Sequence, residues 1–238
     1  VVVKVGSAVL TSKSGLAREV MENLARELHF LLQSGRQVIL VSSGAVAAGR
    51  KKLRLGDRPL TLKEKQAAAA LGQSSLMRAY EDIFEGFGQR IAQILLTHSD
   101  LSQRDRYLNI RNTLFTLLEW GVVPVINEND TVSVKELRFG DNDNLAALVT
   151  NLTEADLLIC LTDVDGLYTA NPCTDPAARL VHAVGRVDKG VEEMAGNVCG
   201  QLGTGGMRSK IMAAGAVAAR GGCSFIGSGR QAGIIRQL

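Results

Sequence analysis

The stretch from Gly140 to Leu145 reads GDNDNL and places two carboxylates and two amides in a row before an apolar helical pattern. A helix start needs one Asp or Asn as its cap, and four such side chains exceed that need. One interpretation is a turn followed by a capped helix, and the other is a binding or catalytic corner.

Lys4 stands inside the apolar run VVVKVGS. An ammonium group is costly to bury in such a strand unless it finds a partner, although a lysine near a strand end also reaches solvent. Gly6 and Ser7 follow directly and give a turn whose backbone could approach a phosphate closely. Both a solvent-directed lysine and a buried lysine with a partner fit this segment.

Two further segments combine small residues with a helix start. VSSGAVAAG, residues Val41–Gly49, runs from a strand into Ser42, Ser43 and Gly44, and GQLGTGGMRSKIMAA, residues Gly200–Ala214, precedes a helix. Backbone N–H groups at such points bind carboxylates or phosphates. Neither segment matches the Walker A pattern or G-x-G-x-x-G. An ordinary turn and a surface loop remain the alternatives.

Polar residues also follow two other apolar runs. LTDVDGLYTANP places Thr162 and Asp163 at the end of a run, and PVINENDTV does the same with Asn127–Asp130. Ligands collect at the carboxyl ends of parallel strands. Each cluster alone fits a solvated turn, but their common position at strand ends favours a shared site.

The elements that must position these residues alternate along the chain. The apolar runs predict strands at residues 1–5, 38–41, 91–96, 122–126, 157–161 and 224–226. The helical patterns cover residues 18–35, 62–84, 109–121, 143–152 and 206–222, and Gly72 allows a break in the second of them. Continuous apolar strands that alternate with helices are typical of an α/β doubly wound sheet. We expect one domain over residues 1–238.

Composition limits the classes of function. The 238 residues are 46% hydrophobic and 21% charged, which is typical of a globular protein and excludes a disordered chain. A net charge of +3 without clustered basic residues gives no nucleic-acid groove, and no apolar stretch is long enough to span a membrane. Cys160 lies inside an apolar run and Cys223 just before another, so we expect buried, reduced thiols and a cytoplasmic location. The four cysteines and three histidines show no zinc-binding spacing.

Taken in order, the motifs VVVKVGS, VSSGAVAAG, PVINENDTV, GDNDNLAAL, CLTDVDGLYTANP and QLGTGGMRSK resemble the glutamate 5-kinases of the amino acid kinase superfamily. The resemblance covers nearly the whole chain. It implies a three-layer sandwich, a largely parallel sheet with helices on both faces. It also implies transfer of the γ-phosphoryl group of ATP to the side-chain carboxylate of L-glutamate, the first step of proline biosynthesis. Magnesium, feedback inhibition by proline and a homo-oligomer, dimer or tetramer, are expected on the same ground.

The resemblance assigns the catalytic roles. Lys4 and Lys210 would hold the transferring phosphoryl group, and Asp143 would orient both lysines. The implied ATP-binding residues are Lys4, Thr162, Asp163, Thr204, Gly205, Gly206, Met207, Arg208, Ser209 and Lys210. No metal ligand from the protein is implied, because Mg²⁺ would be held by phosphate oxygens and water.

The resemblance also assigns the acid-binding residues. Ser43 and the amides around Gly44 would receive a substrate carboxylate. Asn142 would contact glutamate, and Asp130 would bind its ammonium group. GDNDNL would then cap a helix and link the two substrate sites.

The chain opens inside a strand-like run without a methionine, which predicts trimming at the N-terminus, and trimming at the C-terminus is expected too. The resemblance also implies a further C-terminal PUA domain, which many bacterial members of the family carry, and we expect it to be missing from this sequence. Three alternatives stay open: a related kinase acting on aspartate, acetylglutamate, carbamate or a uridine nucleotide, a non-catalytic nucleotide-binding module, and the kinase half of a bifunctional synthase.

Overall fold

A computed structural model of the chain describes residues 1–12, 15–133, 142–196 and 206–238. Its main sheet has six strands in the order β5-β6-β4-β1-β7-β8. Every strand pairs with its neighbours in parallel, and β1 lies between β4 and β7. The strands are β1 (Val2–Val5), β4 (Ile39–Val41), β5 (Ile91–Leu96), β6 (Val123–Glu128), β7 (Leu157–Thr162) and β8 (Cys223–Ser228).

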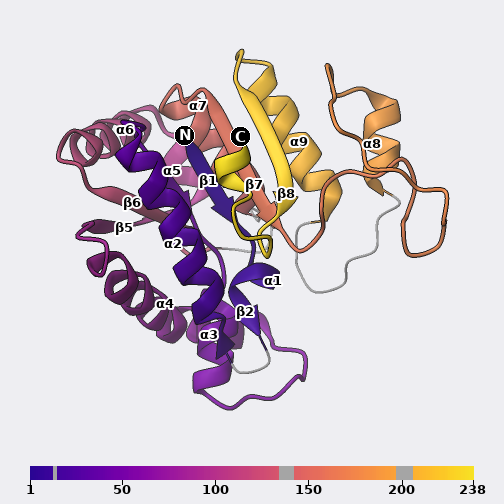
Figure 1. The fold of residues 1–238 in the computed structure, drawn as a ribbon. Coiled ribbons are helices and arrows are strands. Elements are labelled where there is room, and N and C mark those ends of the chain that lie inside the picture. Colours follow the sequence, from indigo (N-terminus) through magenta and orange to yellow (C-terminus); the bar gives the residue numbers. More distant parts are fainter. Residues whose placement is uncertain (13–14, 134–141, 197–205) are drawn as a thin grey trace.

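Helices cover both faces of this sheet (Figure 1). The first face packs against α2 (Arg18–Gln33) and α4 (Leu62–Glu85). The second face packs against α6 (Arg104–Glu119), α7 (Asn142–Leu152) and α9 (Met207–Ala218). The three-layer sandwich with a parallel sheet is therefore confirmed. None of the helices in the described residues is long and apolar enough to cross a bilayer.

Alternation along β1 decides which residues face which layer. Val3 and Val5 belong to the core beside α2 and α4, whereas Val2 belongs to the core beside α7 and α9. Because successive side chains in a strand point to opposite faces, Lys4 shares the face of Val2. Lys4 is thereby directed towards α7 and α9.

Short elements complete the described chain, and of these only α3 was indicated by the sequence. They are α1 (Ser7–Leu10), the hairpin strands β2 (Thr11–Ser12) and β3 (Gly15–Leu16), α3 (Ala45–Lys52), α5 (His98–Ser102), α8 (Lys189–Gly196) and the 3-10 helix η2 (Ile235–Gln237). Of these, α3 lies where the small residues after Gly44 indicated a helix start. The hairpin joins β1 and α1 to α2.

The break considered at Gly72 is wrong, since α4 continues through it to Glu85. A Cβ atom at Gly72 would overlap the carbonyl oxygen of Ala45 and the backbone nitrogen of Gly49 in α3. A Cβ atom at Gly49 would overlap Ala68 of α4 in the same way. Both glycines therefore serve the close approach of two helix backbones.

The expectation for the thiols holds for one cysteine and fails for another. Cys160 in β7 is buried, and Cys223 is exposed. Cys223 is the first residue of β8, which forms an edge of the sheet, so neighbouring elements leave its side chain uncovered. Cys173 is also exposed, and Cys199 lies outside the described residues.

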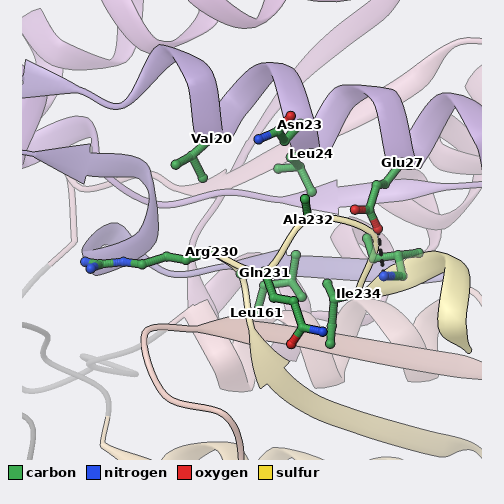
Figure 2. A pocket seen from close by; sticks show the side chains of 11 residues that line it. Val20, Asn23, Leu24, Glu27, Leu161, Arg230, Gln231, Ala232 and Ile234 are labelled. Carbon is green, nitrogen blue, oxygen red and sulfur yellow. Dashed lines mark hydrogen bonds between the residues drawn. The ribbon is translucent and has the colours of Figure 1, made fainter.

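The last segment of the described chain is attached to α2. The buried carboxylate of Glu27 accepts hydrogen bonds from the backbone N–H groups of Gly233 and of Ile235, the latter at 2.6 Å. Figure 2 shows Glu27 directed at this segment, beside a small hollow that Val20, Leu24 and Arg230 help to line. The hollow lies on the α2 side of the sheet, opposite the side chain of Lys4.

Candidate active site

Three charged side chains meet beneath the carboxyl ends of the central strands. Lys4 comes from β1, Asp143 from the first turn of α7 and Lys210 from the first turns of α9. The Lys4 ammonium is paired with Oδ1 of Asp143, and Lys210 Nζ lies 3.1 Å from Oδ2. The structure thus brings together three residues that are far apart in the sequence.

This cluster is withdrawn from water. Lys4, Asp143 and Lys210 expose only 2%, 0% and 4% of their surfaces. Two ammonium groups and one carboxylate leave a net charge of +1 in a buried place. The N-termini of α7 and α9 add partial positive charge at the same point. The arrangement is therefore suited to binding an anion, and a phosphoryl group in particular.

Ser209 also reaches the carboxylate. Its hydroxyl lies 2.7 Å from Oδ2 of Asp143 and 2.7 Å from the carbonyl oxygen of Gly206, and it donates to one of them at a time. The sequence placed Ser209 only among the ATP-binding residues. In the structure, Ser209 is also a hydrogen-bond donor that helps to hold the carboxylate of Asp143 in place.

A second corner, made of uncharged side chains and called the acid-side corner below, lies beside the cluster. Nδ2 of Asn142 lies 2.7 Å from Ser43 Oγ, 2.8 Å from the Ser42 carbonyl oxygen and 3.0 Å from Oδ1 of Asn127. Gly44 follows with φ +103°, a left-handed conformation that suits glycine, and precedes α3. Asn142 and Asp143 are consecutive, so one helix start touches both the charged cluster and this corner.

The remaining acid-side residue, Asp130, is half-buried and lies two residues beyond the end of β6. It therefore stands at the same edge of the sheet as Ser43, because β4 and β6 are parallel neighbours. Asn127 is the last buried residue of β6, and its contact with Asn142 was not anticipated from the sequence.

The residues assigned to the nucleotide fall into two groups. Thr162 ends β7, is buried, and lies 3.2 Å from a carboxylate oxygen of Asp163 through its hydroxyl. Gly206, Met207, Arg208, Ser209 and Lys210 form the start of α9. Thr204 and Gly205 lie outside the described residues.

Within the second group the side chains differ in what they contact. Met207 is buried in an apolar cluster with Leu167, Ala195 and Ile211, so its side chain packs α9 against α8. Arg208 is exposed, and Gly206 has an extended conformation before the helix. The backbone N–H groups of this first helical turn have no partner within the helix, as at any helix start.

Tyr80 supports the acid-side corner from α4. Its hydroxyl lies 2.9 Å from Ser42 Oγ, and both side chains are fully buried. Burial raises the pKa of Tyr80 far above its ordinary value, and the hydrogen bond with Ser42 opposes this only in part. The phenol is therefore neutral across the physiological range.

No three His, Cys, Asp or Glu side chains gather to hold a metal ion in the part of the chain that the structure describes. The protein groups at the candidate site are instead ammonium, amide, hydroxyl and backbone N–H groups. Such groups suit an anion directly, and they suit a cation only when it arrives already bound to that anion.

Known proteins resemble this chain in sequence and in fold. The family model described as the amino acid kinase family matches residues 1–226. The chain belongs to the amino acid kinase family.

Curated relatives narrow the comparison. The chain is 61% identical over 239 residues to the glutamate 5-kinase of Desulfotalea psychrophila, and 54% identical over 238 residues to that of Syntrophotalea carbinolica. Both matches cover 100% of this chain and 64% of the relative. The chain thus spans somewhat less than two thirds of the length of these relatives.

Solved structures share the fold at low sequence identity. An isopentenyl phosphate kinase superposes with a TM-score of 0.65 at 22% identity, covering 99% of this chain and 94% of that one. A carbamate kinase from Giardia lamblia bound to AMP-PNP gives a TM-score of 0.64 at 14% identity, covering 96% and 92%. These likenesses support the kinase fold of the chain and say nothing further about its substrate.

Proposed function

We propose that this chain is the kinase domain of a glutamate 5-kinase. It would transfer the γ-phosphoryl group of ATP to the side-chain carboxylate of L-glutamate and give γ-glutamyl phosphate, the first step of proline biosynthesis. The observation that carries the proposal is the buried pairing of Lys4 and Lys210 with Asp143, next to the corner formed by Ser43 and Asn142. The glutamate 5-kinases that align with the whole chain support the choice of acid.

The chemistry needs no general base. The side-chain carboxylate of glutamate has an ordinary pKa of about 4.3 and is ionised at neutral pH, so it is already a nucleophile. The obstacle is repulsion between an anionic carboxylate and an anionic phosphate. Lys4 and Lys210 would offset that repulsion and hold the transferring group in line, which is the usual basis of phosphoryl transfer.

Asp143 would act on the lysines rather than on the substrate. It accepts from both ammonium groups and fixes their spacing, and it keeps the net charge of the empty cluster at +1 instead of +2. Lys4 and Lys210 would then bind the phosphoryl oxygens without moving far. The backbone N–H groups from Gly206 onward would bind the adjacent phosphates.

Magnesium would arrive with ATP. Bound to phosphate oxygens, it would supply positive charge that Lys4 and Lys210 do not supply alone. The described residues fit this mode, because their site offers phosphate-binding groups and no cluster of carboxylates. Mg²⁺ commonly keeps several waters and binds chiefly through substrate phosphates.

The acid substrate would lie at the acid-side corner. The Ser43 hydroxyl and the backbone around Gly44 would receive the α-carboxylate, and Asp130 would pair with the α-ammonium. Asn142 would complete the contact with glutamate. This placement directs the side-chain carboxylate towards the charged cluster, which lies next along α7.

The test is acyl phosphate formation by the purified chain. Mg-ATP is supplied with L-glutamate, L-aspartate or N-acetylglutamate, and the product is trapped with hydroxylamine while ADP is measured. Hydroxamate with L-glutamate alone is the expected result. Hydroxamate with another acid instead would replace the substrate, and ATP binding without any hydroxamate would favour a nucleotide-binding module.

Four further properties belong to the same proposal. The chain would be one amino acid kinase domain, would act in the cytoplasm, and would assemble as a homo-oligomer whose mass light scattering measures directly. Proline would inhibit it by feedback. Addition of proline to the hydroxamate assay should lower turnover at subsaturating glutamate, and unchanged turnover at every proline concentration would remove that part of the proposal.

A further inference from the structure

Three polar side chains lie seven residues apart along α4 and contact three different segments of the acid-side corner. Nε2 of Gln66 donates to the Ser133 carbonyl oxygen at 3.2 Å, and Oε1 of Gln73 accepts from Asn127 Nδ2 at 2.9 Å. The third is Tyr80, whose hydroxyl is hydrogen-bonded to that of Ser42. Residues seven apart share one face of an α-helix, about 10.5 Å from one another along its axis. One face of α4 therefore supports the loops after β4 and β6.

The contact of Gln73 continues as a series of side-chain amides. Asn127 is 3% exposed, and its Oδ1 accepts from the Glu128 backbone N–H at 2.9 Å and from Asn142 Nδ2 at 3.0 Å. Nδ2 of Asn127 is thereby left for Gln73. The series runs from Gln73 through Asn127 to Asn142, which is the residue assigned to glutamate.

Backbone groups fix the direction of this series. The Ser42 carbonyl oxygen only accepts hydrogen bonds, so the Asn142 atom 2.8 Å away must be Nδ2. The Glu128 N–H only donates, so the Asn127 atom that faces it must be Oδ1. The amide orientations at Asn127 and Asn142 are thus determined, and Oε1 of Gln73 satisfies the donor that remains.

The series leaves Asn142 Oδ1 as a hydrogen-bond acceptor. This atom is buried and has no partner among residues 1–12, 15–133, 142–196 and 206–238. A buried carbonyl oxygen without a donor is unfavourable and favours a ligand that supplies one. Because Asn142 Nδ2 is occupied by Ser42, Ser43 and Asn127, the side chain offers a ligand an acceptor and not a donor.

We propose that Gln73 is a positioning residue for substrate selection. Through Asn127 it holds Asn142 with Oδ1 presented to a donor of the substrate, the α-ammonium group of an amino acid. This inference rests on the proposed function for the identity of the substrate. It predicts that Gln73 affects discrimination between L-glutamate and glutarate, the same dicarboxylate without an amino group.

The test compares Gln73→Met with Gln73→Glu and with Gln66→Met. Gln73→Met keeps the length of the side chain and removes the acceptor, whereas Gln73→Glu keeps an acceptor at that position. Gln66→Met is the same substitution on the same helix, where the lost partner is the Ser133 carbonyl and not the amide series. The measurements are KM for L-glutamate, KM for ATP and the inhibition constant of glutarate.

Gln73→Met is expected to raise KM for L-glutamate about tenfold, the size of effect that follows loss of one buried hydrogen-bond partner. KM for ATP and the inhibition constant of glutarate should change by less than about twofold, because neither ligand meets Asn142 Oδ1 through an ammonium group. Gln73→Glu should restore most of the discrimination. Gln66→Met should leave the ratio of glutamate to glutarate affinity as in the unaltered chain.

Two outcomes separate the inference from the function on which it rests. An unaltered chain that forms no acyl phosphate with L-glutamate would refute the proposed function and the ammonium assignment with it. An active chain whose discrimination is unmoved by Gln73→Met would overturn the role of Gln73 alone. If Gln73→Met does not fold, Gln73→Asn withdraws the amide by one methylene and repeats the test with a polar side chain.

Discussion

Asp143→Asn should destabilise the protein strongly, because it removes a buried carboxylate that pairs with both Lys4 and Lys210. At an effective dielectric constant of about 20, each ammonium–carboxylate attraction at such distances is about 5 kcal/mol before desolvation is counted. Breaking a buried pair by removing one partner typically costs about 3–5 kcal/mol, because a buried charge is left uncompensated. Here two ammonium groups lose the same carboxylate.

This loss of stability is large relative to the total free energy of unfolding of the protein. Domains of this kind have free energies of unfolding of about 5–15 kcal/mol, so a loss of about 3–5 kcal/mol should move a urea midpoint far to lower concentration. Lys4→Met provides the matched comparison, since Met fills a similar volume and leaves Asp143 paired with Lys210. We expect it to abolish most turnover while lowering the free energy of unfolding by less than about 2 kcal/mol.

The assays are urea titration and hydroxamate formation on the same preparations. The double variant Lys4→Met with Asp143→Asn should be more stable than Asp143→Asn alone, because one of the two cations that lost the Asp143 carboxylate is gone. Glu22→Gln is the exposed control, since its pair with Arg18 leaves both side chains 44% or more exposed and should matter by less than about 1 kcal/mol. An Asp143→Asn protein that unfolds at the midpoint of the unaltered chain would refute the buried cluster.

Three further predictions concern packing, pH and substrate binding. Gly72→Ala should lower the free energy of unfolding by about 1–3 kcal/mol or more, because its Cβ would overlap the backbone of α3, whereas Gly196→Ala meets no atom within 4 Å and should not; urea titration of both variants checks this. The hydrogen bond from Arg58, with those from the N-cap residue of α4, lowers the pKa of Glu64 from 4.5 to about 2. The unaltered chain should therefore be more stable than Glu64→Gln, by a difference that is full above pH 4.5 and disappears as the pH falls towards 2. The thermal midpoints of the two proteins measure this difference, and a difference that stays constant with pH would contradict the prediction. Asp130→Ala should raise KM for glutamate much more than KM for ATP, and equal rises would contradict its assignment to the substrate ammonium.

The sequence predicted the main elements because their signals are local. Continuous apolar runs gave the strands of the parallel sheet, and a helical repeat of apolar residues gave α2, with Gly35 just beyond its end. The interpretation failed at Gly72, where a helix-breaking residue serves contact with another helix. It failed at Cys223 because an apolar neighbourhood in sequence does not reveal an edge strand.

The candidate site, like the fold, could be predicted from the sequence only in part. The spacing of residues 4, 143 and 210 in the sequence could not predict that they lie together, so their roles were assigned from the family resemblance. The structure shows that they are in contact. Gln73 and Tyr80 were overlooked because α4 was considered only as a helical pattern. Their signal was available as polar residues at 66, 73 and 80, a repeat of seven on a helix with an apolar face.

The central position of β1 has a consequence for how the chain folds. This strand precedes the other strands of the sheet in the sequence, yet it pairs with β4 on one side and with β7, more than 150 residues later, on the other. Non-local parallel pairing of this kind is slow to form. Lys4 therefore stays hydrated on an uncovered strand until β7, α7 and α9 arrive, and its burial coincides with the arrival of its counter-ion. A nascent chain that ends before Lys210 has no complete cluster, so phosphoryl transfer and the final closure of the sheet should appear together during refolding.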